Sequence, residues 1–478
     1  MLRVTPLVAQ HDRTTAALAW ARAHGVLDEC QARFGEVIDF LQALPLERAL
    51  PIVRERYSAD HGRPAYDPLL MLRTELARRI LRVDSRDAFA QLVLAPSIFL
   101  RLLLGYPPQG EGLTPCGETL RRFEHRVCPS RRRSVVLPPK RSQRHGKLTE
   151  RAAAFLARAH DRPPAMRRPS TVDRLLRSVG FEPAMAQGLI PQDAVVMADG
   201  SFLESRTGRH GKKVCDHGRE RCDCPRRYTD PLARVGHDHH EDRSVYGYLA
   251  NIAAVDTVLG DPLVVAITMH PARRFDGVAT LLTLVRALEL YPELSGRFVT
   301  LDSASDSSSH GLFTRRLGLR PIVPLRASGK GGFAIDNIAF TEDGVPLCAG
   351  GYPMRPHGTV GERQRWICPG EVASSGIAPH MPCHRRGWRT ISFRPQDDYR
   401  LVAGVHRGSE AFRSLYARRS AIERAVNKPA MADGNVEHGS RVQSRGRRFF
   451  DLFLEALIGY ARAFIRSNAA KPDPPLTA

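Results

Sequence analysis

The spacing of apolar residues divides the chain into a helical first part and a mixed second part. Throughout the first part, apolar residues recur every three to four positions, which is the period of amphipathic helices. The clearest example is Leu69–Leu81, with Pro68 in a position that suits the first turn of a helix. Ser85 can cap the next helical stretch, and a third begins near Pro96 or Ser97. The pattern predicts an all-helical domain over residues 1–128.

After residue 190 the pattern changes to short apolar runs bounded by turn residues, alternating with helical stretches. This alternation is typical of an α/β fold with a mixed sheet. The predicted order is β-β-β-α-β-α-β, with strands over Ala194–Leu203, Tyr246–Val255, Pro262–Met269, Arg297–Leu301 and Pro321–Leu325, and helices over Gly277–Leu290 and Ser308–Leu317.

Residues 326–405 are rich in Gly and Pro and interrupt this order, so they are predicted to form an insertion with short strands, Leu401–Val405 among them. A helix over Ser409–Lys428 then restores the α/β layer, and Pro429 ends it. The last amphipathic helix, Arg448–Arg466, carries charged residues along its length and is expected to pack on the sheet rather than cross a membrane.

The charge of the chain favours a polyanionic partner. The net charge is +21, and 64 of the 71 basic residues are Arg. Such an excess attracts nucleic acid or an anionic membrane surface. Arg can form two parallel hydrogen bonds to a phosphate, although codon usage in a GC-rich genome also favours Arg over Lys. Residues 129–190 are basic and Pro-rich, and are predicted as a linker with one short helix near 149–159 that either tracks phosphates or is a plain solvated tether.

Neither a membrane span nor a disulfide framework is expected from the sequence. There is no uninterrupted apolar run of membrane-spanning length, and the first residues lack the apolar core of a secretory signal. Nine Cys among 478 residues is an odd and small number, which favours a reducing compartment such as the cytoplasm.

Three acidic residues stand out as candidate ligands for divalent metal. Asp199 ends the apolar run AVVMAD, Asp302 ends the run RFVTLD, and Glu423 lies in the helical stretch YARRSAIERAVNK. Strand ends are where open α/β sheets place their ligand chemistry, although either Asp alone also fits an ordinary turn or cap. Three carboxylates brought together can hold divalent cations. In so basic a protein, the natural substrate of such a site is a phosphodiester.

The helix around Glu423 adds candidate phosphate-binding residues. Tyr416, Arg419 and Glu423 fall within an arc of about 60° at ideal helical pitch. Arg419 can orient Glu423, grip a phosphate, or form an ordinary surface ion pair, and Tyr416 fits equally well as a core aromatic. Arg424 and Lys428 are further candidates for contacting phosphate.

Two groups of Cys and His residues have the composition of zinc sites but not the spacing of a familiar zinc finger. The first is Cys215, His217, Cys222 and Cys224, followed by several His residues; the second is Cys348, Cys368, Cys383 and His384, within the insertion. For both groups, the alternative is unliganded Cys in a reducing compartment.

Several segments resemble the DDE transposases of bacterial insertion sequences. The helical part is similar in GRPAYDPLLMLR, RDAFAQLVLAPSIFLRLLLGY and LTPCGETLRRFEHRV, and the second part in VVMADGSFLES, VTLDSASDS and Tyr416-x2-Arg419-x3-Glu423. The resemblance implies a ribonuclease H-like catalytic domain in which Asp199, Asp302 and Glu423 bind two Mg²⁺ or Mn²⁺ ions. Two departures from the family pattern are Ala430, where a Lys is frequent, and Ser303-Ala304, where Gly-Tyr is frequent.

The sequence therefore predicts a transposase that cuts and joins DNA at insertion-sequence ends, in the cytoplasm at the nucleoid, as a homodimer in its active complex. Residues 1–128 would be a helical DNA-binding or dimerisation domain or a plain bundle, 191–430 the catalytic domain, and 431–478 a C-terminal helix packed on it. The alternatives are a decayed or regulatory relative that binds transposon ends without cutting, and a zinc-stabilised nucleic-acid-binding protein without catalysis.

Overall fold

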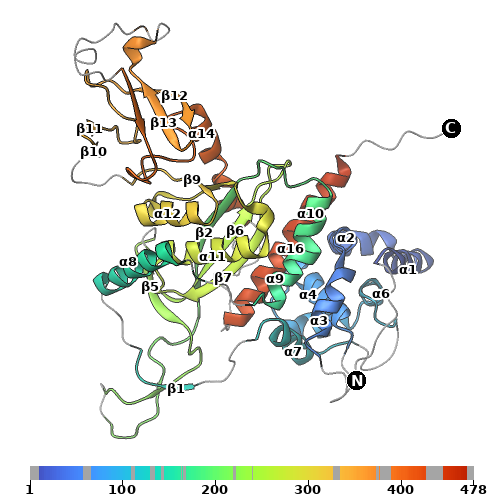
Figure 1. Ribbon diagram of the computed structural model, residues 1–478. Helices are drawn as coiled ribbons and strands as arrows, with labels where there is room; N and C mark the ends of the chain where they lie inside the picture. The colour runs from blue at the N-terminus through green and yellow to red at the C-terminus, as the bar shows by residue number, and fades with distance from the viewer. Residues whose placement is uncertain are drawn as a thin grey trace, which may run out of the picture.

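The computed structural model describes residues 10–57, 66–108, 114–129, 135–140, 145–162, 164, 168–218, 222–238, 241–326, 334–372, 376, 389–426 and 445–470. Within these ranges the chain is a mixed α/β protein, as predicted, with helices packed around a curled mixed sheet (Figure 1).

The central sheet has the strand order β7-β6-β2-β8-β9, with β5 beside the first part of β6. β6 is antiparallel to its neighbours β2 and β7, whereas β8 and β9 run parallel to β2. Helix α11 (Asp276–Leu290) packs against β2, β6 and β7. The strands are β2 (Val196–Glu204), β5 (Arg234–Asp238), β6 (Arg243–Val255), β7 (Leu263–Pro271), β8 (Phe298–Thr300) and β9 (Arg320–Ile322).

The strands β6 and β7 are buried along most of their length, and their continuous apolar runs are why these strands could be predicted from the sequence. From Tyr248 to Val255 every residue of β6 is buried, which is the pattern of a strand covered on both faces. The five predicted strands and the helices at 277–290 and 308–317 are confirmed within one to three residues at each end. β5 was not predicted, because its sequence RVGHD is half exposed and carries little apolar signal.

The helical first part begins with α1 and α2, and three of its later helices start at a capping side chain, of which only Ser85 was predicted as a cap. The Asp67 side chain accepts a hydrogen bond from the backbone N–H of Leu69, Ser85 from Ala88, and Ser97 from Leu100. The elements are α1 (Gln10–Ala23), α2 (Leu27–Ala43), α3 (Leu50–Arg54), α4 (Pro68–Ile80), α5 (Arg86–Ala88), a π-helical turn (Phe89–Leu94), α6 (Ile98–Leu104) and α7 (Gly117–Val127).

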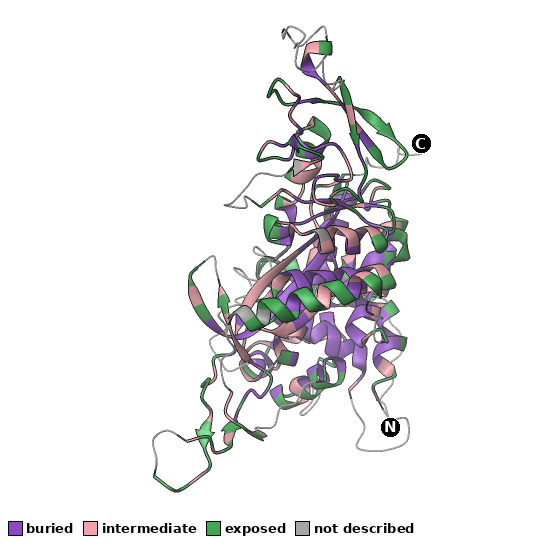
Figure 2. Cartoon of the chain, turned by 60° about the vertical axis from the view of Figure 1, so that its left-hand side comes forward, coloured by how far each residue is buried: buried purple, intermediate pink, exposed green. Residues whose placement is uncertain are grey.

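The C-terminal helix α16 (Arg445–Ala469) joins the helical part to the sheet. It packs against β7 on one side and against α2, α4 and α7 on the other. A single hydrophobic core runs from the helical part through α16 into the sheet, so the two parts do not have separate cores. Figure 2 shows this core as the buried centre of the molecule.

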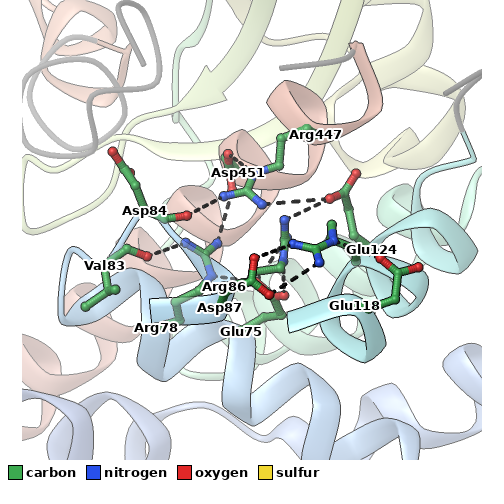
Figure 3. A network of polar contacts seen from close by, with 11 residues as sticks. Glu75, Arg78, Val83, Asp84, Arg86, Asp87, Glu118, Glu124, Arg447 and Asp451 are labelled. Carbon is green, nitrogen blue, oxygen red and sulfur yellow. Dashed lines mark hydrogen bonds and ion pairs between the residues drawn. The ribbon is translucent and has the colours of Figure 1, made fainter. Parts of the chain in front are cut away.

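A buried network of ion pairs fixes α16 on the helical part (Figure 3). Glu75 of α4 accepts hydrogen bonds from Arg78 and Arg86, and the side chains of all three are essentially inaccessible to solvent. Arg78 reaches Asp451 of α16 at 3.3 Å, and Arg86 reaches Glu124 of α7 at 2.9 Å. Because unpaired buried charges are costly, such a network selects one relative position for the helices that share it.

The segment predicted as a linker is more ordered than expected. It contains β1 (Val135–Leu137), α8 (His145–Asp161), α9 (Thr171–Leu175), a π-helical turn (Leu176–Phe181) and α10 (Glu182–Ala186). Ser170 and Asp173 form a capping box that starts α9, and Asp173 also pairs with Arg286 of α11. The basic composition of this segment gives no indication of these buried contacts.

The insertion forms a small lobe with its own core around Trp366. Its strands are β10 (Ala334–Ile335), β11 (Ile338–Ala339), β12 (Arg355–Val360), β13 (Arg363–Ile367) and β14 (Thr390–Phe393). The strand predicted at Leu401–Val405 is wrong: this stretch is a buried turn whose Ala403 carbonyl accepts a hydrogen bond from Gln364. Its apolar residues are buried without strand pairing.

Helix α12 comprises Ser308–Arg316. The single helix predicted over Ser409–Lys428 is instead two helices, α14 (Glu410–Ala417) and α15 (Ser420–Val426). The Ser409 side chain caps α14 by accepting a hydrogen bond from the backbone N–H of Phe412. Lys428 and Pro429 lie outside the described residues.

Within the described ranges no single helix is long and apolar enough to cross a membrane; only the halves Arg86–Leu94 and Ile98–Leu104, bent by 113°, reach such a length and composition together.

Candidate active site

Asp199 and Asp302 lie side by side on neighbouring parallel strands. Asp199 is inside β2, which continues to Glu204, rather than at its end as the sequence suggested. Asp302 comes two residues after β8 ends. In the register of the two strands, Met197 pairs with Thr300, so two residues further along each strand Asp199 and Asp302 are level. Ser305 donates a hydrogen bond to the Asp302 carboxylate at 3.2 Å.

A fourth carboxylate, Asp276, belongs to the same site and was not predicted. It is the first residue of α11 and packs over Gly200, where a Cβ would overlap its carboxylate. Asn251, which pairs with Gly200 across β2 and β6, lies 3.4 Å from Asp276 through its side-chain amide. In the sequence Asp276 has only the signal of an ordinary acidic residue in a first helical turn. Its place beside Asp199 depends on how α11 crosses the sheet.

The pKa values of two of these acids indicate a shared site. Burial raises the pKa of Asp199 to about 6, against the opposing effect of Arg419 and with added repulsion from Asp302 and Glu423. Burial raises the pKa of Asp276 to about 7, with added repulsion from Asp199 and Asp302. Carboxyl groups that are buried and crowded in this way keep their protons to higher pH than exposed ones, and a nearby cation would favour their ionised form.

Arg419 connects Asp199 to Glu423. Its guanidinium lies 3.6 Å from the Asp199 carboxylate and 3.4 Å from that of Glu423, which is half exposed. The predicted contact between Arg419 and Glu423 is confirmed, and the contact with Asp199 is additional. The break between α14 and α15 follows from Arg418, which turns away to pair with the buried Asp256. Asp256 in turn accepts a hydrogen bond from the backbone N–H of Val195, at the start of β2.

Tyr416 and Arg424 are farther from this arrangement. Tyr416 packs with Phe412 and Ile322 in a small apolar cluster, which fits the core role left open by the sequence. Arg424 is exposed and donates a hydrogen bond to the carbonyl of Gly260 at 3.2 Å. Lys428, the remaining candidate for phosphate contact, lies outside the described residues.

An arginine-lined hollow adjoins the acidic residues. It has a volume of about 180 Å³ and is lined by Arg151 of α8 and by Arg273, Arg274 and Phe275, which immediately precede Asp276. Burial lowers the pKa of Arg273, and repulsion from Arg234, Arg151 and Arg274 lowers it further. Arginines held this close repel one another, and a bound anion would relieve that repulsion. The hollow is therefore a positively charged site at the start of α11.

The first Cys/His group is brought together, and the second is only partly described. Ligand atoms of Cys215, His217, Cys222 and Cys224 all lie within 4.8 Å of one another. Among the described residues no other group of three or more potential ligands is this close, so the four carboxylates are more widely spaced than the thiols. Cys348 and Cys368 are buried in the insertion lobe, whereas Cys383 and His384 lie outside the described residues.

Comparison of the sequence with known protein families finds no matching family, and comparison with curated proteins finds no similar one.

Proposed function

We propose that the chain is a DDE transposase that cuts and joins phosphodiester bonds at the ends of an insertion sequence, using divalent metal ions. The observation that carries this proposal is that Asp199 and Asp302 each come two residues after the register pair Met197–Thr300 of β2 and β8, with Asp276 against Gly200 and Glu423 linked to Asp199 through Arg419. These four acids come from elements far apart in the sequence.

The donor set fits Mg²⁺ or Mn²⁺. All candidate ligands are carboxylate oxygens, which hard divalent cations prefer, and the wide spacing of the acids leaves room for water and substrate oxygens as further ligands. When bound, a pair of such ions activates the attacking oxygen and stabilises the leaving oxygen of a phosphodiester. Asp199, Asp302 and Glu423 are the residues that would hold these ions, as the resemblance implies.

The proposed role of Arg419 differs from that of the metal ligands. Without cations its guanidinium neutralises Asp199 and Glu423 and keeps both side chains oriented toward the site. The planar guanidinium of Arg419 would also be able to hold a substrate phosphate through two hydrogen bonds. Asp276, whose pKa is raised to about 7, accepts or holds a proton beside the reacting groups at neutral pH.

The ribonuclease H-like fold is part of the proposal. It is supported by a sheet in which three antiparallel strands, β2, β6 and β7, are extended by the parallel strands β8 and β9. In this order β2 is central, and its acidic residue faces the end of β8. The fold thus provides a rigid base for carboxylates on two strands, and α11 and α15 supply the other two.

DNA is the proposed substrate because of charge. The chain has a net charge of +21, and the arginine-lined hollow at Arg151, Arg273 and Arg274 lies next to Asp276 in the sequence. Backbone phosphates bound there would direct a strand toward the carboxylates, with affinity that falls steeply as salt rises. A homodimer acting at the nucleoid in the cytoplasm remains part of the same proposal.

The test is nicking of DNA that carries the sequences flanking the gene. Wild-type protein with Mg²⁺ or Mn²⁺ is expected to nick this DNA at the element end, and Asp199→Ala should reduce the rate by at least ~10²-fold, since a metal ligand is lost. Asp161→Ala, on the exposed end of α8, is the matched control and should retain wild-type activity. Equal nicking by wild type and Asp199→Ala would contradict the proposal.

A second candidate function is binding of element ends without cleavage. The observation that favours it is the engagement of Arg419 with both Asp199 and Glu423, which already neutralises the site. In that case the protein binds end-containing DNA specifically, metal ions do not change the binding, and no nick forms at any metal concentration.

A further inference from the structure

The Cys/His group sits at the tip of a hairpin that brings its ligands together. β3 (Lys212–Lys213) pairs with β4 (Arg226–Tyr228), with Lys213 opposite Arg226. Two residues beyond each strand, the same register sets Cys215 opposite Cys224. Alternate residues of an extended chain point to the same side, so His217 joins Cys215, and Cys222 joins Cys224. The spacing C-x-H…C-x-C, unfamiliar as a zinc-finger pattern, is explained by this hairpin.

The distances match a tetrahedral zinc site. With Zn–S of about 2.3 Å and Zn–N of about 2.0–2.1 Å, the ligand atoms of such a site lie about 3.6–3.8 Å apart. The sulfurs of Cys215 and Cys222 are 3.6 Å apart, within this range, and His217 Nε2 is 3.2 Å from the sulfur of Cys224, slightly closer than a bound ion would set them. A disulfide between Cys215 and Cys222 would need sulfurs about 2.05 Å apart, so these two thiols are not oxidised to one.

The hairpin belongs to a small sheet whose described residues form no apolar core, so a bound metal ion would stabilise it. Its three-stranded sheet, β1-β4-β3, lies away from the central sheet, as the position of β1 in Figure 1 shows. Tyr228 is the one fully buried side chain among its described strand residues, whereas Val136 and Val214 are 45% and 47% exposed. A unit of this size without an apolar core normally depends on a disulfide or a metal for its order.

We propose that Cys215, His217, Cys222 and Cys224 bind one structural Zn²⁺ ion. Three thiolates and one imidazole fill all four tetrahedral positions, so no position is left for substrate or catalytic water. The soft sulfur ligands select zinc over the hard cations that suit the carboxylate site. The ion clips the loop between β3 and β4 and holds the basic pairs Lys212-Lys213 and Arg226-Arg227 in a fixed orientation. This inference does not depend on the proposed function.

The test is the zinc content of the full-length protein purified from zinc-supplemented medium. Cys222→Ser and Cys224→Ser should each contain one zinc fewer per chain than wild type, as measured by elemental analysis. Cys116→Ser changes an exposed Cys outside the group and is the matched control, with unchanged zinc content. His217→Cys supplies a fourth thiolate and should keep the zinc. The comparison isolates this site even if the insertion lobe holds an ion of its own.

A second measurement covers the case in which a Ser variant fails to fold. Wild-type protein stripped of metal and titrated with Co²⁺ should gain the thiolate-to-cobalt charge-transfer absorption, and added Zn²⁺ should abolish it. Zinc should also slow proteolytic cleavage between residues 214 and 225. The proposal is overturned if Cys222→Ser and Cys224→Ser keep the full zinc content of wild type, or if metal-stripped protein neither binds Co²⁺ nor gains protection with Zn²⁺.

Discussion

At the scale of single residues, the sequence indicated Asp199, Asp302 and Glu423 and missed Asp276, the first residue of α11. Asp199 and Asp302 were recognisable because an apolar run stops at each of them. Asp276 was not, because an acidic residue in a first helical turn is common and its neighbour Gly200 comes from another element. The Cys/His group was recognised by residue type, but the pairing that brings it together depends on β3 and β4, which are too short to predict.

The raised pKa of Asp276 predicts a pH-dependent effect of Asp276→Asn on stability. In the folded state this carboxyl holds its proton up to about pH 7, whereas unfolded it releases it near pH 3.8. Between these values the folded state binds more protons, so this group makes the wild type less stable as pH rises. Without metal, Asp276→Asn should therefore gain stability relative to wild type from about pH 4 to 7, and the gain should level off above that range.

The measurement is chemical denaturation of both proteins at several pH values, with EDTA and with Mn²⁺. Burial lowers the pKa values of His270 and His310 to about 4, so these two residues make the folded state more stable as pH rises. Both proteins contain them, so comparing the two proteins removes this effect. Mn²⁺ should stabilise the wild type more than the variant above pH 7, since the cation needs the ionised carboxylate. A stability difference that stays constant with pH would show that the Asp276 carboxyl is not perturbed.

At the scale of elements, long apolar runs were predicted well, and positions decided by distant polar contacts were not. The strands β6 and β7 and the helix α11 follow from their own sequences. The break between α14 and α15 does not, because it depends on Arg418 reaching Asp256, 162 residues earlier in the chain. Likewise α9 follows from the capping box at Ser170 and Asp173, but its anchoring on Arg286 of α11 has no local signal.

The buried ion network at α4 predicts unequal effects of two Glu→Gln substitutions. Glu75→Gln leaves the guanidinium groups of Arg78 and Arg86 buried with less compensation, and should cost roughly 3–5 kcal/mol of unfolding free energy. Glu118→Gln is the control. Glu118 pairs with Arg121 and Arg122 at the surface, so this substitution should lower the free energy of unfolding by less than about 1 kcal/mol. Urea denaturation measures both. Similar small losses would mean that the network does not hold α4 in place.

At the scale of the whole molecule, the division into domains expected from the sequence gives way to one shared core. The change of period near residue 190 separates two kinds of secondary structure, but α16 packs against both and unites their apolar surfaces. The sequence of α16 predicts an amphipathic helix. Which surfaces it covers could not be predicted, because both the helical part and the sheet offer apolar faces to it.

A cavity in α16 should therefore weaken both parts together. Leu457→Ala removes a fully buried side chain and should cost about 2–5 kcal/mol. Hydrogen exchange should then accelerate in parallel for the amides of α4 and β6. Leu92→Ala, at a side chain that is 70% exposed, is the control and should leave both unchanged. Faster exchange in only one of the two elements would contradict a shared core.

The position of α16 also determines when the protein can mature during its synthesis. Its residues leave the ribosome after those of α4 and β7, yet they complete the interior that these two elements share. Until α16 has been synthesised, the nascent chain exposes these apolar surfaces to the surrounding solution, where chaperones can bind them. A chain cut short before residue 445 lacks the helix that joins its two parts and is expected to leave these surfaces uncovered.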